Sequence, residues 1–154
     1  IRLSGLPGSK NLYQKNYDYK FGKSIRIIKG NDLLILSHGS ILGEIKSSVD
    51  NLKNELSIEL INMPTIKPFD KSITKRLKKF NKIITIEEHT SIGGLGSIIA
   101  EKIAKNRIKT NFLSISLPDK FGPTGDYNFL LKYHRLNSEN ITKRILKFLK
   151  EKKS

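Results

Sequence analysis

The stretch from Ile83 to Ser97 reads IITIEEHTSIGGLGS, and it decides the fold of this 154-residue chain. A β-branched run over Ile83–Ile86 is followed by two carboxylates, a histidine and a glycine cluster that opens an apolar helix. This order is typical of a buried strand that turns sharply into a helix, because glycines allow a tight turn and close packing. The stretch therefore predicts a strand-to-helix junction with polar groups at the rim of a sheet.

Strands and helices alternate on both sides of this junction. Apolar runs of strand length lie at residues 24–28, 33–36, 58–61, 83–86 and 112–115. Helical periodicity lies at residues 41–56, 73–80, 95–103, 127–133 and 138–148. Such alternation is typical of parallel strands connected by helices that cover the sheet. We therefore expect an α/β fold, a three-layer sandwich in which helices cover both faces of a mostly parallel sheet of about five strands, one of them antiparallel.

Local signals refine this expectation at three places. Lys29-Gly30-Asn31 is typical of a tight turn, so we expect the strand over Ser24–Ile28 to pair antiparallel with the strand that follows it. Ser40 and Asp70 each stand just before a helical periodicity. Because a side-chain oxygen at that position accepts a free backbone amide, we expect both residues to be N-caps.

Composition limits the possible functions. A hydrophobic share of 37% and a charged share of 28% are typical of one folded domain. The chain has no cysteine and three histidines, so we expect neither a disulfide nor a metal site. No apolar run has the length of a membrane span and no secretory signal is visible, so we expect a cytoplasmic protein with no membrane partner.

The net charge of +15 leaves two interpretations open. A free-standing basic module could bind nucleic acid, because clustered Lys and Arg release counterions from phosphates. Alternatively, the lysines form solvated helix faces. The densest basic runs, at residues 75–79 and 147–153, fall on predicted amphipathic helices or at the C-terminus. The second interpretation is favoured, so nucleic acid is not the expected partner.

Residues 1–22 differ from the rest of the chain. They contain turn-forming glycines and a proline together with tyrosines at positions 13, 17 and 19. Scattered aromatics among polar and turn-forming residues are typical of a connector rather than of a core segment. We expect a connector arm at residues 1–22 and a compact domain at residues 23–154. Because the chain starts with isoleucine, we also expect it to be a fragment of a longer protein.

Four segments carry a family resemblance, and they are Asp32–Ser40, Asn62–Asp70, Glu87–Ser97 and Pro118–Gly125. They resemble, in order and spacing, the opening strand and turn, the "TIKPLD" segment, the "EEH…GGLGS" segment and the "PD-F" glycine segment of the transketolase C-terminal domain. The resemblance spans roughly residues 20 to 150. It is nearest to the form of transketolase whose chain is split into two subunits.

The resemblance implies a parent transferase that moves a two-carbon ketol unit between sugar phosphates. In that family, thiamine diphosphate supplies the carbanion chemistry and is bound with Mg²⁺ by other domains. The resemblance also implies that residues 1–22 connect to a preceding pyrimidine-binding domain, which is absent here. We expect this domain to support interdomain packing and a homodimer, to bind no cofactor alone and to contain no catalytic residue.

Two other thiamine-dependent parents remain open, a deoxyxylulose-phosphate synthase and a pyruvate dehydrogenase beta-type subunit. At the equivalent position those synthases have a segment similar to "RYPRG", whereas this chain has Arg2-Leu3-Ser4-Gly5. They also have an arginine directly after the equivalent of Met63, where this chain has Pro64. Both departures favour the transketolase-type parent.

The candidate site residues fall into two groups. Candidates for contact with substrate are Arg2, near the end of an expected strand, and His38 and His89, at predicted strand ends. For either histidine, a role in satisfying a turn is the favoured interpretation. We interpret the rim residues as structural, and they are Glu87, Glu88, Gly93, Gly94 and Gly96.

Each rim residue also has a chemical interpretation. Glu87 and Glu88 could act as acid and base, but hydrogen bonds to turn amides or to a neighbouring domain are favoured. The glycines could cradle a phosphate at the helix start. They do not fit the spacing of a dinucleotide fingerprint, so tight strand-to-helix packing is favoured.

Overall fold

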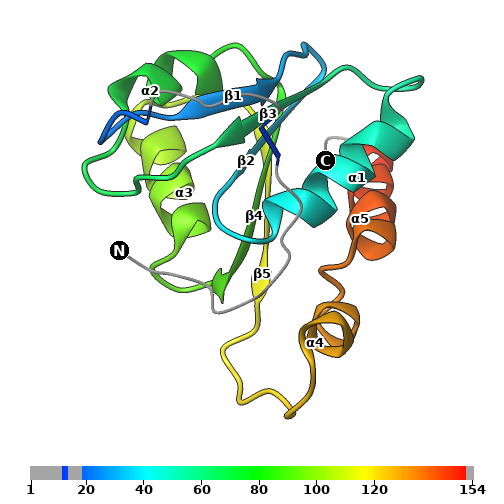
Figure 1. The fold of residues 1–154 in the computed structure, drawn as a ribbon. Helices are drawn as coiled ribbons and strands as arrows, with labels where there is room; N and C mark the ends of the chain where they lie inside the picture. Colours follow the sequence, from blue (N-terminus) through cyan, green and yellow to red (C-terminus); the bar gives the residue numbers. More distant parts are fainter. Residues whose placement is uncertain (1–11, 14–18, 152–154) are drawn as a thin grey trace.

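The computed structural model describes residues 12–13 and 19–151 (Figure 1). In this part of the chain, strands and helices alternate as the periodicity predicts. In chain order they are β1 (Ile25–Ile28), β2 (Leu33–Ser37), α1 (Leu42–Leu52), β3 (Ile58–Asn62), α2 (Lys71–Leu77), β4 (Lys82–Thr90), α3 (Leu95–Lys105), β5 (Asn111–Leu117), α4 (Tyr127–Tyr133) and α5 (Ser138–Lys150).

The sheet has the strand order β1-β3-β2-β4-β5. Strands β3, β2, β4 and β5 are parallel, and β1 is antiparallel at the edge. The expected α/β class with one antiparallel strand is therefore confirmed. Because the four parallel strands point the same way, their carboxyl ends meet at one edge of the sheet.

The expected pairing of the first two strands is wrong. Strand β1 pairs with β3, with Ile25 opposite Asn62, and β2 lies on the far side of β3. The turn after β1 does not close a hairpin, because the amides of Asn31 and Asp32 both donate to the carbonyl of Ser57 at the start of β3. Those bonds carry the chain across the amino end of β3 before β2 begins.

Two apolar clusters, one on each face of the sheet, make a three-layer sandwich. Leu33 and Ile35 of β2 point toward α1, α4 and α5, while Leu34 and Leu36 point toward α2 and α3. All four side chains are fully buried. Successive side chains of a strand alternate between faces, so a continuous apolar run fits a strand covered on both sides. Figure 1 shows the two helical layers on either side of the sheet.

The two expected N-caps have different outcomes. Asp70 caps α2 as predicted, because its carboxylate accepts the Ser72 amide at 3.0 Å. Ser40 does not cap α1, whose N-cap is Ile41 in helical conformation without a side-chain bond. The Ser40 hydroxyl instead donates to Oε2 of Glu88 at 2.8 Å. A long-range partner therefore replaces the local one.

The described part of the arm is attached near the carboxyl end of β3. The Asn62 side-chain amide donates to the Tyr13 hydroxyl at 2.8 Å. The hydroxyls of Tyr19 and Thr65 are 3.1 Å apart. Arg2 and Tyr17 lie outside the described residues. The boundary between arm and domain stays a prediction.

Candidate functional site

The carboxyl edge of the sheet gathers the polar groups that the sequence placed at strand ends. Strand β2 ends at Ser37 and leads into His38, and β4 continues through Glu87, Glu88 and His89 to Thr90. The apolar run at Ile83–Ile86 predicted only the first half of β4, because two carboxylates and a histidine follow that run. These side chains therefore belong to the strand itself, and strand alternation decides which way each one points.

Glu87 holds the beginning of α3. Its side chain is fully buried and accepts the amides of Leu95 at 2.7 Å and Gly96 at 2.8 Å. Nε2 of His38 lies 3.6 Å from Oε2 of the same carboxylate. Burial alone raises the pKa of Glu87, but His38 and the two amides outweigh it and hold the pKa below its ordinary value. The partial positive charge of the free amides at a helix N-terminus also favours the ionised carboxylate there.

The glycine cluster fits around this carboxylate. Gly93 has a φ of 77°, which places the turn in the left-handed region that favours glycine. A Cβ on Gly94 would overlap the Glu87 carboxylate, and a Cβ on Gly96 would overlap the Ser114 side chain. The free amides at the start of α3 thus bind Glu87, and a phosphate at this position would face a buried negative charge.

Glu88 points to the opposite face of the sheet. It accepts the Ser40 hydroxyl beside the start of α1. Burial, together with the nearby Glu88 carboxylate, raises the pKa of the Tyr127 hydroxyl on α4. Glu87 and Glu88 therefore serve different layers and do not form an acid–base pair. Tyr127 could not be recognised from the sequence, because nothing near it in the sequence indicates that it lies beside Glu88.

The three substrate candidates have separate positions. His38 is 26% exposed and lies against Glu87. Nδ1 of His89 lies 3.2 Å from the carbonyl of Thr90, a contact within its own turn. Arg2 is outside the described residues.

Within residues 12–13 and 19–151, no group of three or more His, Asp or Glu side chains is arranged to hold a metal ion. In the same ranges, no helix has both the length and the apolar character of a membrane span.

A five-stranded, mostly parallel sandwich with this glycine-capped rim defines a domain of known type. The family model described as "Transketolase, C-terminal domain" matches residues 22–141. The chain belongs to the transketolase C-terminal domain family.

Individual relatives agree with this family. A protein of Methanocaldococcus jannaschii, described as "Putative transketolase C-terminal section", is 40% identical over 134 residues, which are 86% of this chain and 42% of that protein. A 1-deoxy-D-xylulose-5-phosphate synthase of Blochmanniella pennsylvanica is 33% identical over 145 residues, which are 94% of this chain and 23% of that enzyme. The chain thus spans less than half of either relative.

A solved structure shows the same fold. The structure titled "Split gene transketolase, inactive beta4 tetramer" superposes with a TM-score of 0.81 at 22% identity. The superposition covers 95% of this chain and 47% of that one. The fold of this chain therefore matches about half of that longer chain.

Proposed function

We propose that this chain is the C-terminal domain of a cytoplasmic transketolase-type transferase. The parent enzyme would move a two-carbon ketol unit between sugar phosphates. The observation that carries the proposal is the family match over residues 22–141, together with 40% identity to a protein described as a transketolase C-terminal section. Thiamine diphosphate with Mg²⁺, held by other domains of the parent, would supply the carbanion chemistry.

The role of this domain in the proposal is architectural. The glycine-lined start of α3 is a place where backbone amides could meet a diphosphate, but Glu87 already binds the amides of Leu95 and Gly96. These residues do not fit the diphosphate. Glu87 fixes α3 and Glu88 fixes the start of α1, so the rim is held rigid for contact with neighbouring domains. Arg2, His38 and His89 are the residues that we assign to the substrate side or to such a contact.

Reconstitution tests this proposal. The chain alone should show no ketol transfer, and mixing it with the polypeptide that supplies the other domains should restore transfer from a ketose phosphate to an aldose phosphate. Calorimetry of the chain alone with thiamine diphosphate and Mg²⁺ should show no saturable micromolar binding. Activity that stays absent in the complete, correctly assembled mixture would contradict the proposal, as would tight cofactor binding by the chain alone. The homodimer that we propose for the complete enzyme is checked by sedimentation of the same mixture.

A deoxyxylulose-phosphate synthase is the second candidate parent, because the relative from B. pennsylvanica described as such a synthase is 33% identical to this chain. The two activities differ in their donor, which is a ketose phosphate for the transketolase and pyruvate for the synthase. Reconstituted enzyme should therefore accept the ketose phosphate and fail with pyruvate. Pro64 after Met63, where the synthases have an arginine, supports this expectation.

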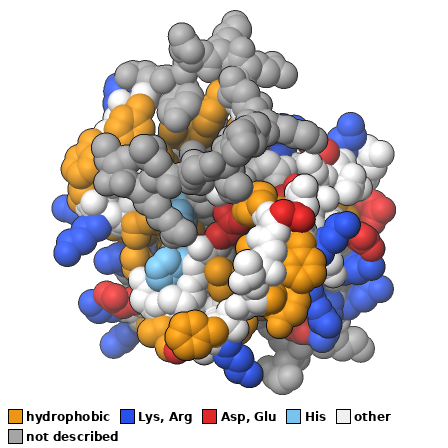
Figure 2. Space-filling model, turned by 60° about the horizontal axis from the view of Figure 1, so that its bottom comes forward, with side chains coloured by type: hydrophobic (Ala, Val, Ile, Leu, Met, Phe, Trp, Pro, Cys, Tyr) orange, Lys and Arg blue, Asp and Glu red, His pale blue; other side chains and the backbone are white. Residues whose placement is uncertain are grey.

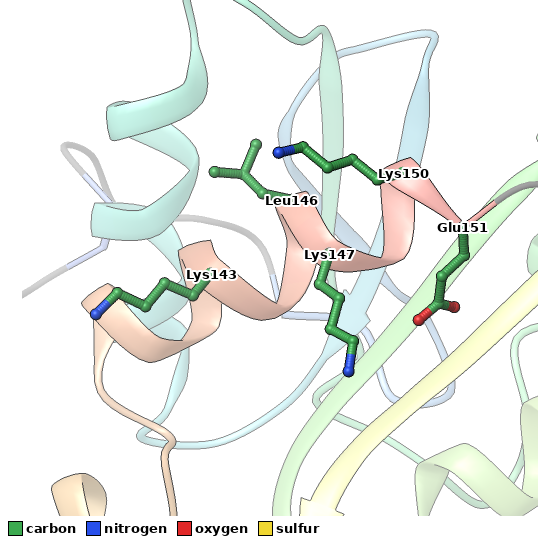
Figure 3. A pocket seen from close by; sticks show the side chains of 5 residues that line it. All are labelled: Lys143, Leu146, Lys147, Lys150 and Glu151. Atoms are coloured by element: carbon green, nitrogen blue, oxygen red, sulfur yellow. The ribbon is translucent and has the colours of Figure 1, made fainter.

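The structure offers little support for a nucleic-acid module. On three helices, an exposed lysine pairs with a carboxylate four residues away, and the pairs are Lys46–Asp50, Lys105–Glu101 and Lys143–Glu139. A hollow of about 460 Å³ on α5 is lined by Lys143, Leu146, Lys147, Lys150 and Glu151. In Figure 3 Lys147 points away from the side on which Lys143 and Lys150 lie, so the three lysines do not converge on one point. DNA or RNA binding with a steep salt dependence would revive this alternative.

A further inference from the structure

The two edge strands of the sheet differ in how they are protected. Strand β1 has four residues, carries the partly exposed Arg26 and has a register shift against β3. Short length, charged side chains and irregular pairing are devices that keep an edge strand from pairing with another chain. Strand β5, at the other edge, has seven residues, and none of them is charged (Figure 1). The β5 edge is therefore suited to pairing with a further strand.

The outward backbone groups of β5 follow from its bonds to β4. The amide of Asn111 donates to the residue just before β4, and the carbonyl of Leu117 accepts from the residue just after β4. Backbone groups of successive strand residues point to opposite sides, so every second residue of β5 faces away from β4. These outward residues are Phe112, Ser114 and Ser116. Within residues 12–13 and 19–151, β5 pairs with β4 alone, so its outward groups have no strand partner there.

The charge of the chain restricts where two copies could meet. At a net charge of +15, most of the surface of one copy repels most of the surface of another. Figure 2 shows Lys and Arg side chains around the margins of the face that it views. A contact between copies therefore needs a strip that is free of basic side chains. Strand β5 is such a strip over its whole length, from Asn111 to Leu117.

We propose that β5 pairs antiparallel with β5 of a second copy, across a two-fold axis at Ser114. In this register, Ser114 exchanges both backbone bonds with Ser114 of the second copy, and Phe112 exchanges both with Ser116. The contact is self-complementary, as a two-fold interface requires, and it joins the two sheets into one. The inference goes beyond the proposed function and does not depend on ketol transfer.

The charges that flank β5 support a second copy as the occupant. Lys109 lies two residues before the strand and Asp119 lies two residues after it, so the axis at Ser114 brings Lys109 of each copy opposite Asp119 of the other. Both side chains are exposed. Opposite charges that face each other across antiparallel strands stabilise the pair, and like charges destabilise it. One register thus pairs the outward backbone groups and both flanking charges.

The same register matches the side chains on both faces of the sheet. Leu113 lies opposite Ile115 of the second copy on the face covered by α1 and α5, and Phe112 lies opposite Ser116 on the other face. Leu113 and Phe112 each pack against the apolar cluster of their own face and are partly buried. Pairing would remove the rest of their apolar surface from water, which stabilises the contact.

The test uses the whole polypeptide that carries this chain, with amide hydrogen exchange measured by NMR. Ser116→Pro removes one outward amide, and proline is tolerated at a free strand edge. The outward amides of Phe112 and Ser114 should exchange at least roughly tenfold faster in this variant than in the wild type, because the edge opens. The amides of Leu113 and Ile115 point toward β4 and should stay protected, which shows that the fold is intact.

Charge reversal tests the register without touching the strand. Lys109→Glu brings two carboxylates together at each end of the contact, so the outward amides should exchange about fivefold faster at low salt. Adding Asp119→Lys restores opposite charges and should restore the wild-type rates. Lys53→Glu is the matched control, because it makes the same charge change at an exposed residue of the loop before β3, and it should leave the rates unchanged.

Each other outcome overturns the pairing inference. Equal exchange of the outward amides in the wild type and in Ser116→Pro would show that the edge is unpaired. Protection that ignores Lys109→Glu would assign the edge to a different segment of the polypeptide or to a companion subunit. Faster exchange in Lys109→Glu that Asp119→Lys does not reverse would reject the axis at Ser114. Ketol transfer by the wild-type assembly tests the proposed function separately, whatever the exchange rates are.

Discussion

Two buried carboxylates, Asp70 at the start of α2 and Glu87 at the start of α3, do the same work in different ways. Each accepts backbone amides at a helix N-terminus, and each has a pKa held below its ordinary value. Asp70 caps the helix that it directly precedes. Glu87 reaches α3 from within β4, eight residues before the first amide that it binds.

The difference between them lies in what else each carboxylate determines. Asp70 also accepts the amide and hydroxyl of Ser24, so it ties the entry of β1 to α2. The Glu87 carboxylate occupies space that a side chain at position 94 would fill, so its position depends on a glycine there. A change at the second site should therefore cost more stability than the equivalent change at the first.

The largest expected effect is that of Gly94→Val. The backbone at Gly94 has a φ of −82°, which valine tolerates, so the damage comes from displacing the Glu87 carboxylate. We expect a loss of about 4 kcal/mol in the free energy of unfolding, measured by denaturant titration. Gly43→Ala is the matched control, because a Cβ there meets nothing within 4 Å, and it should be neutral or stabilising. Equal stability of the Gly94→Val variant and the wild type would show that α3 does not depend on this packing.

Glu87→Ala should have the next largest effect. It leaves two buried amides at the start of α3 without an acceptor and opens a small cavity, so we expect a loss of about 3 kcal/mol. Glu87→Gln keeps one side-chain oxygen but turns an amide group toward other donors, and it should lose roughly half as much. If the two variants lost the same stability, the neutral side-chain oxygen of glutamine would contribute nothing to the cap, and the whole loss would come from the missing carboxylate.

Asp70→Asn should cost less, and its cost should depend on pH. Burial raises the pKa of Asp70, but the amides of Ser24 and Ser72 and the Ser24 hydroxyl outweigh it and lower the pKa from 3.8 to about 2. A depressed folded-state pKa adds stability that is complete above the unfolded-state value and is lost as the pH falls toward 2. At 1.36 kcal/mol per pKa unit, the contribution is about 2 kcal/mol near neutral pH.

Urea titrations at a series of pH values check this expectation. The stability difference between the wild type and Asp70→Asn should shrink steadily between about pH 5 and pH 2. A difference that stays constant over this range would mean that the ionised carboxylate does not hold Ser24 and Ser72. Asp50→Asn is a suitable control, because Asp50 is half exposed and pairs on the surface with Lys46.

The same contrast explains which parts of the structure the sequence predicted. The Asp70 cap was readable, because a cap and its helix are neighbours in the chain. The core strands were readable too, since runs such as Leu33–Leu36 are apolar on both faces. The contact between Ser40 and Glu88 was not, because 48 residues separate them and a local cap was the simpler prediction. The partner of β1 was missed for a similar reason, since a distant carbonyl at Ser57 anchors the turn.

The smallest expected effect is that of His38→Gln. This variant tests whether His38, in addition to the α3 amides, stabilises the ionised carboxylate of Glu87. His38 is partly exposed and 3.6 Å from the carboxylate, so water screens the interaction and the loss of stability should be about 0.5 kcal/mol. The pKa of Glu87 should nevertheless rise, because His38 is among the groups that lower it. Carboxyl carbon shifts measured by NMR across acid pH would report this change. An unchanged Glu87 titration would mean that the two α3 amides alone hold the carboxylate and that His38 is available for a partner or substrate.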